Sequence, residues 1–278
     1  MRQLKYVNSQ GQTIDFQQFD TQIYQGNFHT YAWTYEGTAQ RYGTTIDQFG
    51  KDVLEYEMIV AARGGQTAKE NNLNTITEIT EYDVVNNVQG KLWWGDYYLP
   101  CNIISATTAP SEAFFGAEKT LGVMAPYPFW IQEVTREFYA AGKAPEPSQS
   151  EWLDYPYDYG HDYSPPGEGV ESWYIDHYAT SEFVMTIYGP CENPRILING
   201  YPYEVFDTLE AGEYIVIDSR EKTVIKYRSN GTTLNIFDLR AKEQSVFQPI
   251  PGGNLSVTWN ASFGFGLTLF LERSEPAW

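Results

Sequence analysis

The side chains that come closest to a metal site lie between Asp154 and Asp162. Asp154, Asp158 and Asp162 follow one another at every fourth position, and His161 stands beside the last of them. Carboxylates can bind a hard cation, but an EF-hand loop needs acids at alternate positions and a closing glutamate. Because the spacing differs, we interpret this run as a solvated acidic segment and expect no metal site.

Few residues are suited to nucleophilic or acid–base catalysis. The histidines are His29, His161 and His177, and each would need a nucleophile beside it in the fold. The sequence contains no Gly-x-Ser-x-Gly elbow, cysteine-protease signature, His-Glu-x-x-His, Cys-x-x-Cys or glycine-rich phosphate loop. Carboxylates are too numerous to single out a glycosidase pair, whose separation the fold would set. We therefore expect no enzyme, no catalytic residue and no cofactor.

Two further residue types could bear on function. Cys101 and Cys191 are too few for a disulfide framework, so we expect two buried, reduced side chains. Exposed aromatic rings can stack on sugars, although such residues are more often buried or anchor protein contacts. The candidates for glycan or partner contact are Trp152, Trp173, Tyr174 and Tyr201.

The charge balance excludes whole classes of partner. The 278 residues include 18 Lys and Arg against 36 Asp and Glu, which gives a net charge of −18. DNA binders and proteins on anionic membranes need positive charge, so we expect neither stable nucleic-acid binding nor membrane attachment. The first residues lack the apolar core of a signal peptide, and no apolar run is long enough to span a membrane. We expect synthesis in a cytoplasm.

The last third of the chain reads as short strands separated by turns. Asn199-Gly200 and Asn230-Gly231 are hairpin signals, because both residue types tolerate positive φ. Many short strands at regular spacing predict a β-sandwich. The expected strands are 181–188, 195–198, 203–206, 213–218, 223–228, 233–237, 254–259 and 266–272.

The first half is also mainly β, with one helix. We expect a hairpin over residues 5–16, a strand over 53–62 and a hairpin turn at Gly95-Asp96. Residues 67–81 predict a helix, with a Thr67…Glu70 capping box and a stripe of Leu73, Ile76 and Ile79. Residues 122–138 predict a pair of strands, interrupted by Pro126 and Pro128.

Composition divides the chain into three parts. Residues 142–169 are rich in Pro, Tyr and Asp and have no hydrophobic period, so we interpret them as a connector. It separates an amino-terminal β domain (1–141) from a carboxy-terminal sandwich (170–278).

Several short segments follow one another in a recognisable order. They are Lys5–Asn8 with Gly11 and Ile14, Glu81–Val85, Gly90–Trp93, Pro128–Ile131, Ile187–Pro190, Asn193–Ile196, Gly212–Glu213, Ile217–Ser219, Pro249–Gly252 and Glu272–Trp278. In this order they resemble the distal tail protein family of long-tailed bacteriophages over nearly the whole chain. The carboxy-terminal set is the most distinctive.

This resemblance implies a virion component at the distal end of a tail. In the family, amino-terminal β domains form a hexameric ring, which joins the tail tube to a tail-fibre or tail-associated protein. DNA passes through its channel. The carboxy-terminal domain is a galectin-like or carbohydrate-module-like sandwich, often a hub for receptor-binding proteins, and host cell-wall glycan is a further candidate partner. The resemblance implies no catalytic residues. The alternatives are a bacterial or phage carbohydrate-binding module or lectin, and a glycoside hydrolase with unrecognised carboxylates.

Overall fold

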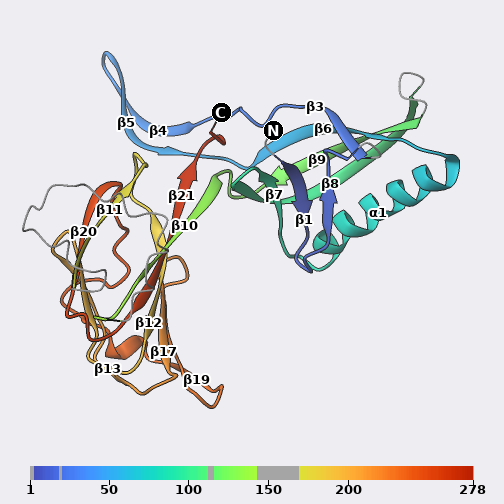
Figure 1. Ribbon diagram of the computed structural model, residues 1–278. Helices are drawn as coiled ribbons and strands as arrows, with labels where there is room; N and C mark the ends of the chain where they lie inside the picture. The colour runs from blue at the N-terminus through green and yellow to red at the C-terminus, as the bar shows by residue number, and fades with distance from the viewer. Residues whose placement is uncertain (1–2, 19–20, 112–115, 143–168, 278) are drawn as a thin grey trace, which may run out of the picture. The chain divides into compact units, whose positions relative to one another are not determined.

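The computed structural model describes residues 3–18, 21–111, 116–142 and 169–277 (Figure 1). The chain forms two compact units, one of Met1–Gln132 with Glu272–Trp278 and one of Glu133–Leu271. These bounds differ from those inferred from composition, 1–141 and 170–278. The chain passes between units inside β10 (Trp130–Phe138) and again inside β21 (Phe265–Arg273), and a continuous strand shows no shift in composition. Most of the expected connector, 142–169, lies outside the described residues.

The first unit is built around one long strand, β8, which pairs on both sides. Its first residues pair with β7 and β10, and the rest pairs with β9. Pairing with β9 begins at Asn102, and a register shift between Ile103 and Ser105 lies within it; such a bulge bends and twists a strand. The order is β10-β8-β7-β1-β2 on one path and β8-β9-β6-β3 on the other. The bounds are β1 Leu4–Val7, β2 Thr13–Asp15, β3 Thr21–Gly26, β6 Leu54–Ala62, β7 Gly90–Trp94, β8 Tyr97–Ser111 and β9 Gly116–Ala125.

Most local predictions for this unit are confirmed. The first hairpin, the strand ending at Ala62 and the Gly95-Asp96 turn all form, and Gly95 has a φ of 62°. Leu99, Cys101 and Ile103 share the core face of β8. Two strands form within 116–138, but β9 and β10 pair with other strands and not with each other, because the Pro126 and Pro128 loop leads the chain to a new edge.

The one α-helix of the described residues, α1 (Gln66–Val85), contacts β8 most extensively, and Figure 1 shows it running beside that strand. The predicted capping box is wrong: Gly65 is the N-cap, with no side-chain cap. The helix starts before Thr67, which therefore lies inside the first turn and too late to cap. Ile76 and Ile79 are buried as predicted, and Leu73 is half-buried.

A buried polar contact holds the helix to the first hairpin. The Asp83 carboxylate is fully buried and accepts hydrogen bonds from the Tyr6 hydroxyl (2.6 Å) and the Ser9 hydroxyl (2.7 Å). Burial and this bond raise the pKa of Tyr6 well above its usual range, so the phenol stays protonated. Removing either partner would leave a buried polar group without its bond.

The second unit is a β-sandwich, as predicted. One sheet has the order β19-β18-β17-β12-β21-β10 and the other β11-β20-β14-β15. Alternate side chains of both sheets point into a shared core, which includes Phe183, Met185, Ile196, Leu255 and Phe265. The bounds are β11 Val170–Ile175, β12 Glu182–Tyr188, β14 Arg195–Ile198, β15 Tyr201–Glu204, β17 Tyr214–Asp218, β18 Thr223–Tyr227, β19 Thr233–Asn235 and β20 Gly253–Trp259. The short strands β13 (Cys191–Glu192) and β16 (Thr208–Leu209) pair, and a 3-10 turn, η1, spans Phe237–Leu239.

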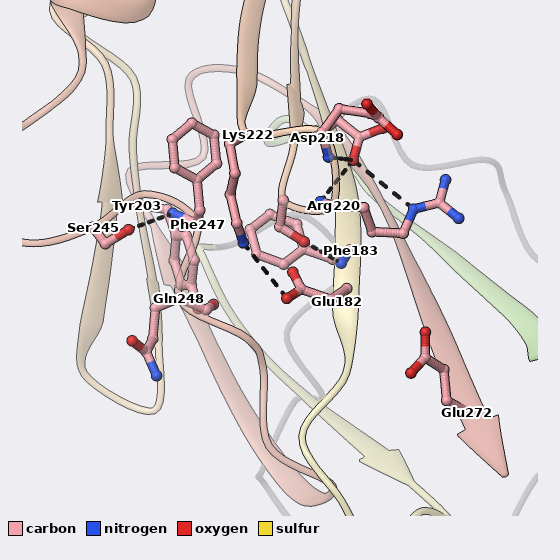
Figure 2. Close-up of polar contacts among 12 residues, drawn as sticks. Glu182, Phe183, Tyr203, Asp218, Arg220, Lys222, Ser245, Phe247, Gln248 and Glu272 are labelled. Atoms are coloured by element: carbon pink, nitrogen blue, oxygen red, sulfur yellow. Dashed lines mark hydrogen bonds and ion pairs between the residues drawn. The ribbon is translucent and has the colours of Figure 1, made fainter. Parts of the chain in front are cut away.

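The turns of the sandwich are fixed by local hydrogen bonds. Figure 2 shows the β17–β18 turn, where Asp218 accepts bonds from the backbone of Arg220 (2.8 Å) and Glu221 (3.1 Å). Asn199 and Gly200 both have positive φ, which confirms that two-residue turn. The Asn230-Gly231 prediction is wrong in form: only Gly231 has positive φ, because residues 228–232 make a longer loop.

Candidate functional site

A hairpin of the first unit extends without any packing of its own; we call it the arm (β4, Thr34–Gln40, and β5, Gly43–Gly50). The two strands pair only with each other, and every side chain from Thr34 to Phe49 is exposed. Figure 1 shows the arm as a long ribbon that projects beyond β3 and β6. A two-stranded ribbon alone is marginally stable in water, and both its edges offer unpaired backbone groups. The arm is therefore a candidate surface for contact with another protein.

The arm carries large apolar side chains on this exposed backbone. Tyr35 and Phe49 stand opposite each other, 64% and 66% exposed, and Tyr42 at the tip is 86% exposed. A cross-strand aromatic pair stabilises a hairpin modestly. Exposed apolar surface of this kind is typical of protein–protein contacts.

Local sequence explains why residues 34–50 form a twisted ribbon. Gln40 pairs with Gly43, so Arg41 and Tyr42 make a two-residue turn, and Gly43 has a φ of 113°. The register shifts between Glu36 and Gly37, where an added Cβ would lie 2.5 Å from the Thr45 carbonyl oxygen. A glycine at position 37 is thus required for this bulge, which twists the arm.

Both ends of the arm meet at a cluster that we call the aromatic base, made of Tyr31, Trp33, Lys51, Tyr127 and Phe129. The Lys51 Nζ lies 4.3 Å from the ring centre of Phe129, 5.0 Å from Trp33 and 5.7 Å from Tyr31. It also donates a hydrogen bond to the Pro128 carbonyl (3.1 Å). These cation–π contacts tie the residues flanking the arm to the loop between β9 and β10.

The charge of Lys51 helps to hold the aromatic base together. Partial burial lowers the pKa of Lys51, and the surrounding ring faces favour its charged form. Tyr127 packs against Phe129 at 5.1 Å between ring centres and donates a hydrogen bond to Glu272 (2.7 Å). The base therefore holds the root of the arm while the rest of the arm stays exposed.

Of the four aromatic residues expected to contact a glycan or partner, the three that the structure describes are not brought together. Trp152 lies outside the described residues. Trp173 packs on the core from β11, whereas Tyr174 points from the other face and is 65% exposed. Tyr201 packs against Tyr203 and donates a bond to the Ser245 carbonyl (2.9 Å). Because β11 and β15 are opposite edges of their sheet, these residues form no common site.

The other reactive residues are dispersed. The rings of His29 and His177 lie against Trp94 and Tyr178, and the acidic run with His161 lies outside the described residues. Cys101 is buried as expected, but Cys191 is only half-buried, because β13 lies at the margin of the core. Burial raises the thiol pKa to about 12 for Cys101 and about 11 for Cys191. Within the described ranges, no cluster of three metal-ligating side chains forms, and no helix is long and apolar enough to cross a membrane.

Sequence reasoning missed the arm and its base. The segment 34–50 has aromatic residues among Thr, Gln and Gly, but the bulge at Gly37 breaks the alternation that would mark a strand pair. The available signal was the two-residue turn before Gly43, flanked by residues of high strand propensity. Lys51 gave no sign of its role, because its partners are scattered along the sequence.

Comparison with known proteins rests on structure alone. No family model matches the sequence, and no curated protein sequence matches it. The Dit protein of phage SPP1, described as a hub of the adsorption apparatus in Gram-positive-infecting phages, matches with a TM-score of 0.63 at 9% identity, over 97% of this chain and 99% of its own. The chain has the fold of a phage distal tail hub protein.

Two baseplate structures agree with this assignment of the hub fold. A chain of the phage P2 baseplate in its activated conformation with Ca matches with a TM-score of 0.62 at 13% identity, and one from the baseplate with Sr with 0.60 at 14%. Each comparison covers 99% of this chain and 100% of the other. The fold that the sequence resemblance implied is thus confirmed over both units.

Proposed function

We propose that this protein is a structural subunit of a phage or prophage tail tip, without enzymatic activity. Copies assemble into a ring, hexameric as in the family it resembles, with the first unit forming the ring. The hub fold over nearly the full length supports this proposal.

The arm is the observation that carries the proposal. A ribbon with both edges free and its aromatic side chains exposed gains its stability from a second protein surface. In a closed ring, each subunit presents the same two surfaces to its neighbours, so every arm finds a site. The aromatic base, by fixing the root, gives each arm the same direction. We therefore assign the arm to contacts between copies of this chain.

The proposed ring also has partners other than copies of this chain. The ring joins the tail tube protein to a tail-associated or fibre protein and serves as a hub for receptor-binding proteins. A net charge of −18 suits a channel that DNA crosses without stable binding, because a basic lining would hold phosphates. We expect the channel wall to be acidic or neutral.

Electron microscopy of the purified full chain tests the ring. We expect closed rings with an open centre, alone or after addition of the neighbouring tail proteins. Single subunits only, at high concentration and beside those tail proteins, would contradict the proposal. Hydrolysis of cell-wall polysaccharide by the purified protein would contradict its non-enzymatic part.

A further inference from the structure

The edge strand β11 of the smaller sandwich sheet leaves backbone groups free to pair. Within the described residues it pairs only with β20, where Ser172 stands opposite Ser256. Ser256 turns both its backbone groups the other way: its carbonyl accepts a hydrogen bond from the Asn199 N–H (2.8 Å), and its N–H donates to the Asn199 side chain (2.7 Å). Because successive residues of an antiparallel pair alternate in direction, the N–H and C=O of Ser172, and likewise those of Val170 and Tyr174, point to the outer edge.

The pattern of β11 fits a second copy of the same strand. Val170 and Tyr174 are 67% and 65% exposed, and an edge strand with exposed apolar side chains is a site of association between molecules. Two antiparallel copies centred on Ser172 would exchange two backbone hydrogen bonds there and set Val170 opposite Tyr174. A β-branched side chain opposite an aromatic one stabilises an antiparallel pair. The backbone and the exposed side chains of β11 are thus compatible with pairing between copies.

A side chain from the opposite sheet occupies this edge; we call the contact of Arg136 with Glu171 and Ser172 the edge clamp. Arg136, on β10, donates a hydrogen bond from Nη1 to the Ser172 carbonyl (2.8 Å) and one from Nη2 to the Glu171 Oε2 (2.7 Å). The two bonds use the planar fork of the guanidinium. The guanidinium also lies 5.2 Å from the ring centre of Phe138, which fixes its position further. The edge clamp therefore occupies the carbonyl at the centre of the pairing pattern.

We propose that the edge clamp keeps β11 from pairing with β11 of another copy. An incoming strand would find the Ser172 carbonyl already bonded, and it would cover the ion pair of Arg136 and Glu171, whose side chains are 34% and 14% exposed. Removing charged groups from water costs free energy that the new contacts must offset. Inward-pointing charged residues protect the edges of natural sheets in this way.

The edge clamp acts apart from ring assembly. All its residues belong to the second unit, whereas the arm belongs to the first. If the wild type forms closed rings, loss of the clamp joins rings into larger clusters, because each ring carries several β11 edges. If the wild type is a single subunit, loss of the clamp gives pairs of subunits. The two proposals can therefore fail separately.

The test compares Arg136→Met with the wild type in the full chain. Methionine keeps an unbranched apolar stem but has neither the charge nor the donors. We expect the molar mass from light scattering to rise with concentration to about twice the wild-type value or more, and hydrogen exchange of the Ser172 amide to slow. Ser172→Pro, added to Arg136→Met, should restore the wild-type mass, because proline has no N–H to pair and is tolerated at a sheet edge.

A second ion pair of the same sheet provides the matched control. Arg195→Met breaks the contact of Arg195 with Glu204 (3.6 Å) away from β11, and it should leave the mass unchanged. Circular dichroism checks the folding of each variant, and Glu171→Gln, which removes the charge with little change of shape, gives the same test if Arg136→Met does not fold. The proposal is overturned if the clamp variants keep the wild-type mass and exchange at every concentration, if Ser172→Pro does not restore the mass, or if Arg195→Met raises it equally.

Discussion

The arm and the sandwich put strand pairing to opposite uses. In β17, Ile215 and Ile217 are fully buried, and pairing serves to build a core. In β5, all residues but Asp47 pair with β4, yet Ile46 and Phe49 remain exposed. Backbone pairing alone does not stabilise a ribbon in water. The difference is that the sandwich strands share a core, whereas the arm has none, and this is why we propose that another copy covers the arm.

Two groups of aromatic side chains differ in what they contact. The aromatic base encloses Lys51, a cation from its own chain, and so it fixes the root of the arm. On β17 and β18, Tyr214 and Tyr227 instead stack on each other at 4.7 Å between ring centres. One cluster surrounds a charge, and the other is a cross-strand aromatic pair.

The largest effect on stability is expected in the sandwich core. Phe265 is fully buried and stacks on Phe138 at 4.6 Å. Phe265→Ala should lower the free energy of unfolding by about 3–5 kcal/mol, because it removes packing and leaves a cavity. Chemical denaturation measures this loss. A change below about 1 kcal/mol would show that this core is loosely packed.

A smaller loss is expected where the helix meets the first hairpin. Tyr6→Phe removes the hydroxyl that donates to buried Asp83 and should cost about 1–3 kcal/mol. Thermal unfolding of the first unit measures it, with Tyr97→Phe as the control, since Tyr97 only packs against the edge of that core. Equal melting temperatures for both variants would show that the Asp83 contact contributes nothing.

At the aromatic base, Lys51→Met keeps the aliphatic stem and removes the charge. The lost cation–π contacts should cost about 1 kcal/mol, and the arm should lose its fixed direction. Hydrogen exchange of residues 34–50 in the isolated subunit would rise if Lys51 orients the arm. Unchanged exchange and unchanged assembly would contradict the role given to this lysine.

The smallest stability effect is expected in the arm itself. Phe49→Ala should change the free energy of unfolding by less than about 0.5 kcal/mol, because the side chain is 66% exposed. The same change should weaken self-association, which analytical ultracentrifugation measures. Phe49→Ala is thus expected to affect self-association more than stability, whereas Phe265→Ala is expected to lower stability. A large stability loss at Phe49 would mean that the arm is packed within its own subunit.

The sequence predicts those parts of the fold that depend on residues close together in the chain. The strands of the sandwich follow from strict alternation, as in Leu255, Val257 and Trp259, and the Asn199-Gly200 turn from two residues that tolerate positive φ. The apolar stripe predicts the helix correctly. It does not predict where the helix begins, because the N-cap residue, Gly65, has no side chain that could mark the position.

The candidate sites were harder to foresee, because they are made by register. Arg136 meets Ser172 only through the packing of two sheets, and Ser172 faces the outer edge only because of its register with Ser256. Lys51 reaches Phe129 across a large separation in sequence. Their aromatic side chains made Trp173 and Tyr201 candidates for ligand contact, but both pack against the sandwich core.

The most direct test of the assembly role compares the molar mass of the wild type with that of a variant whose residues 34–50 are replaced by a short Gly/Ser linker. Light scattering over a range of concentrations should give a closed oligomer for the wild type and a folded single subunit for the variant. A single subunit for both, even with neighbouring tail proteins added, or the same oligomer for both, would contradict the assignment of the arm to contacts between copies.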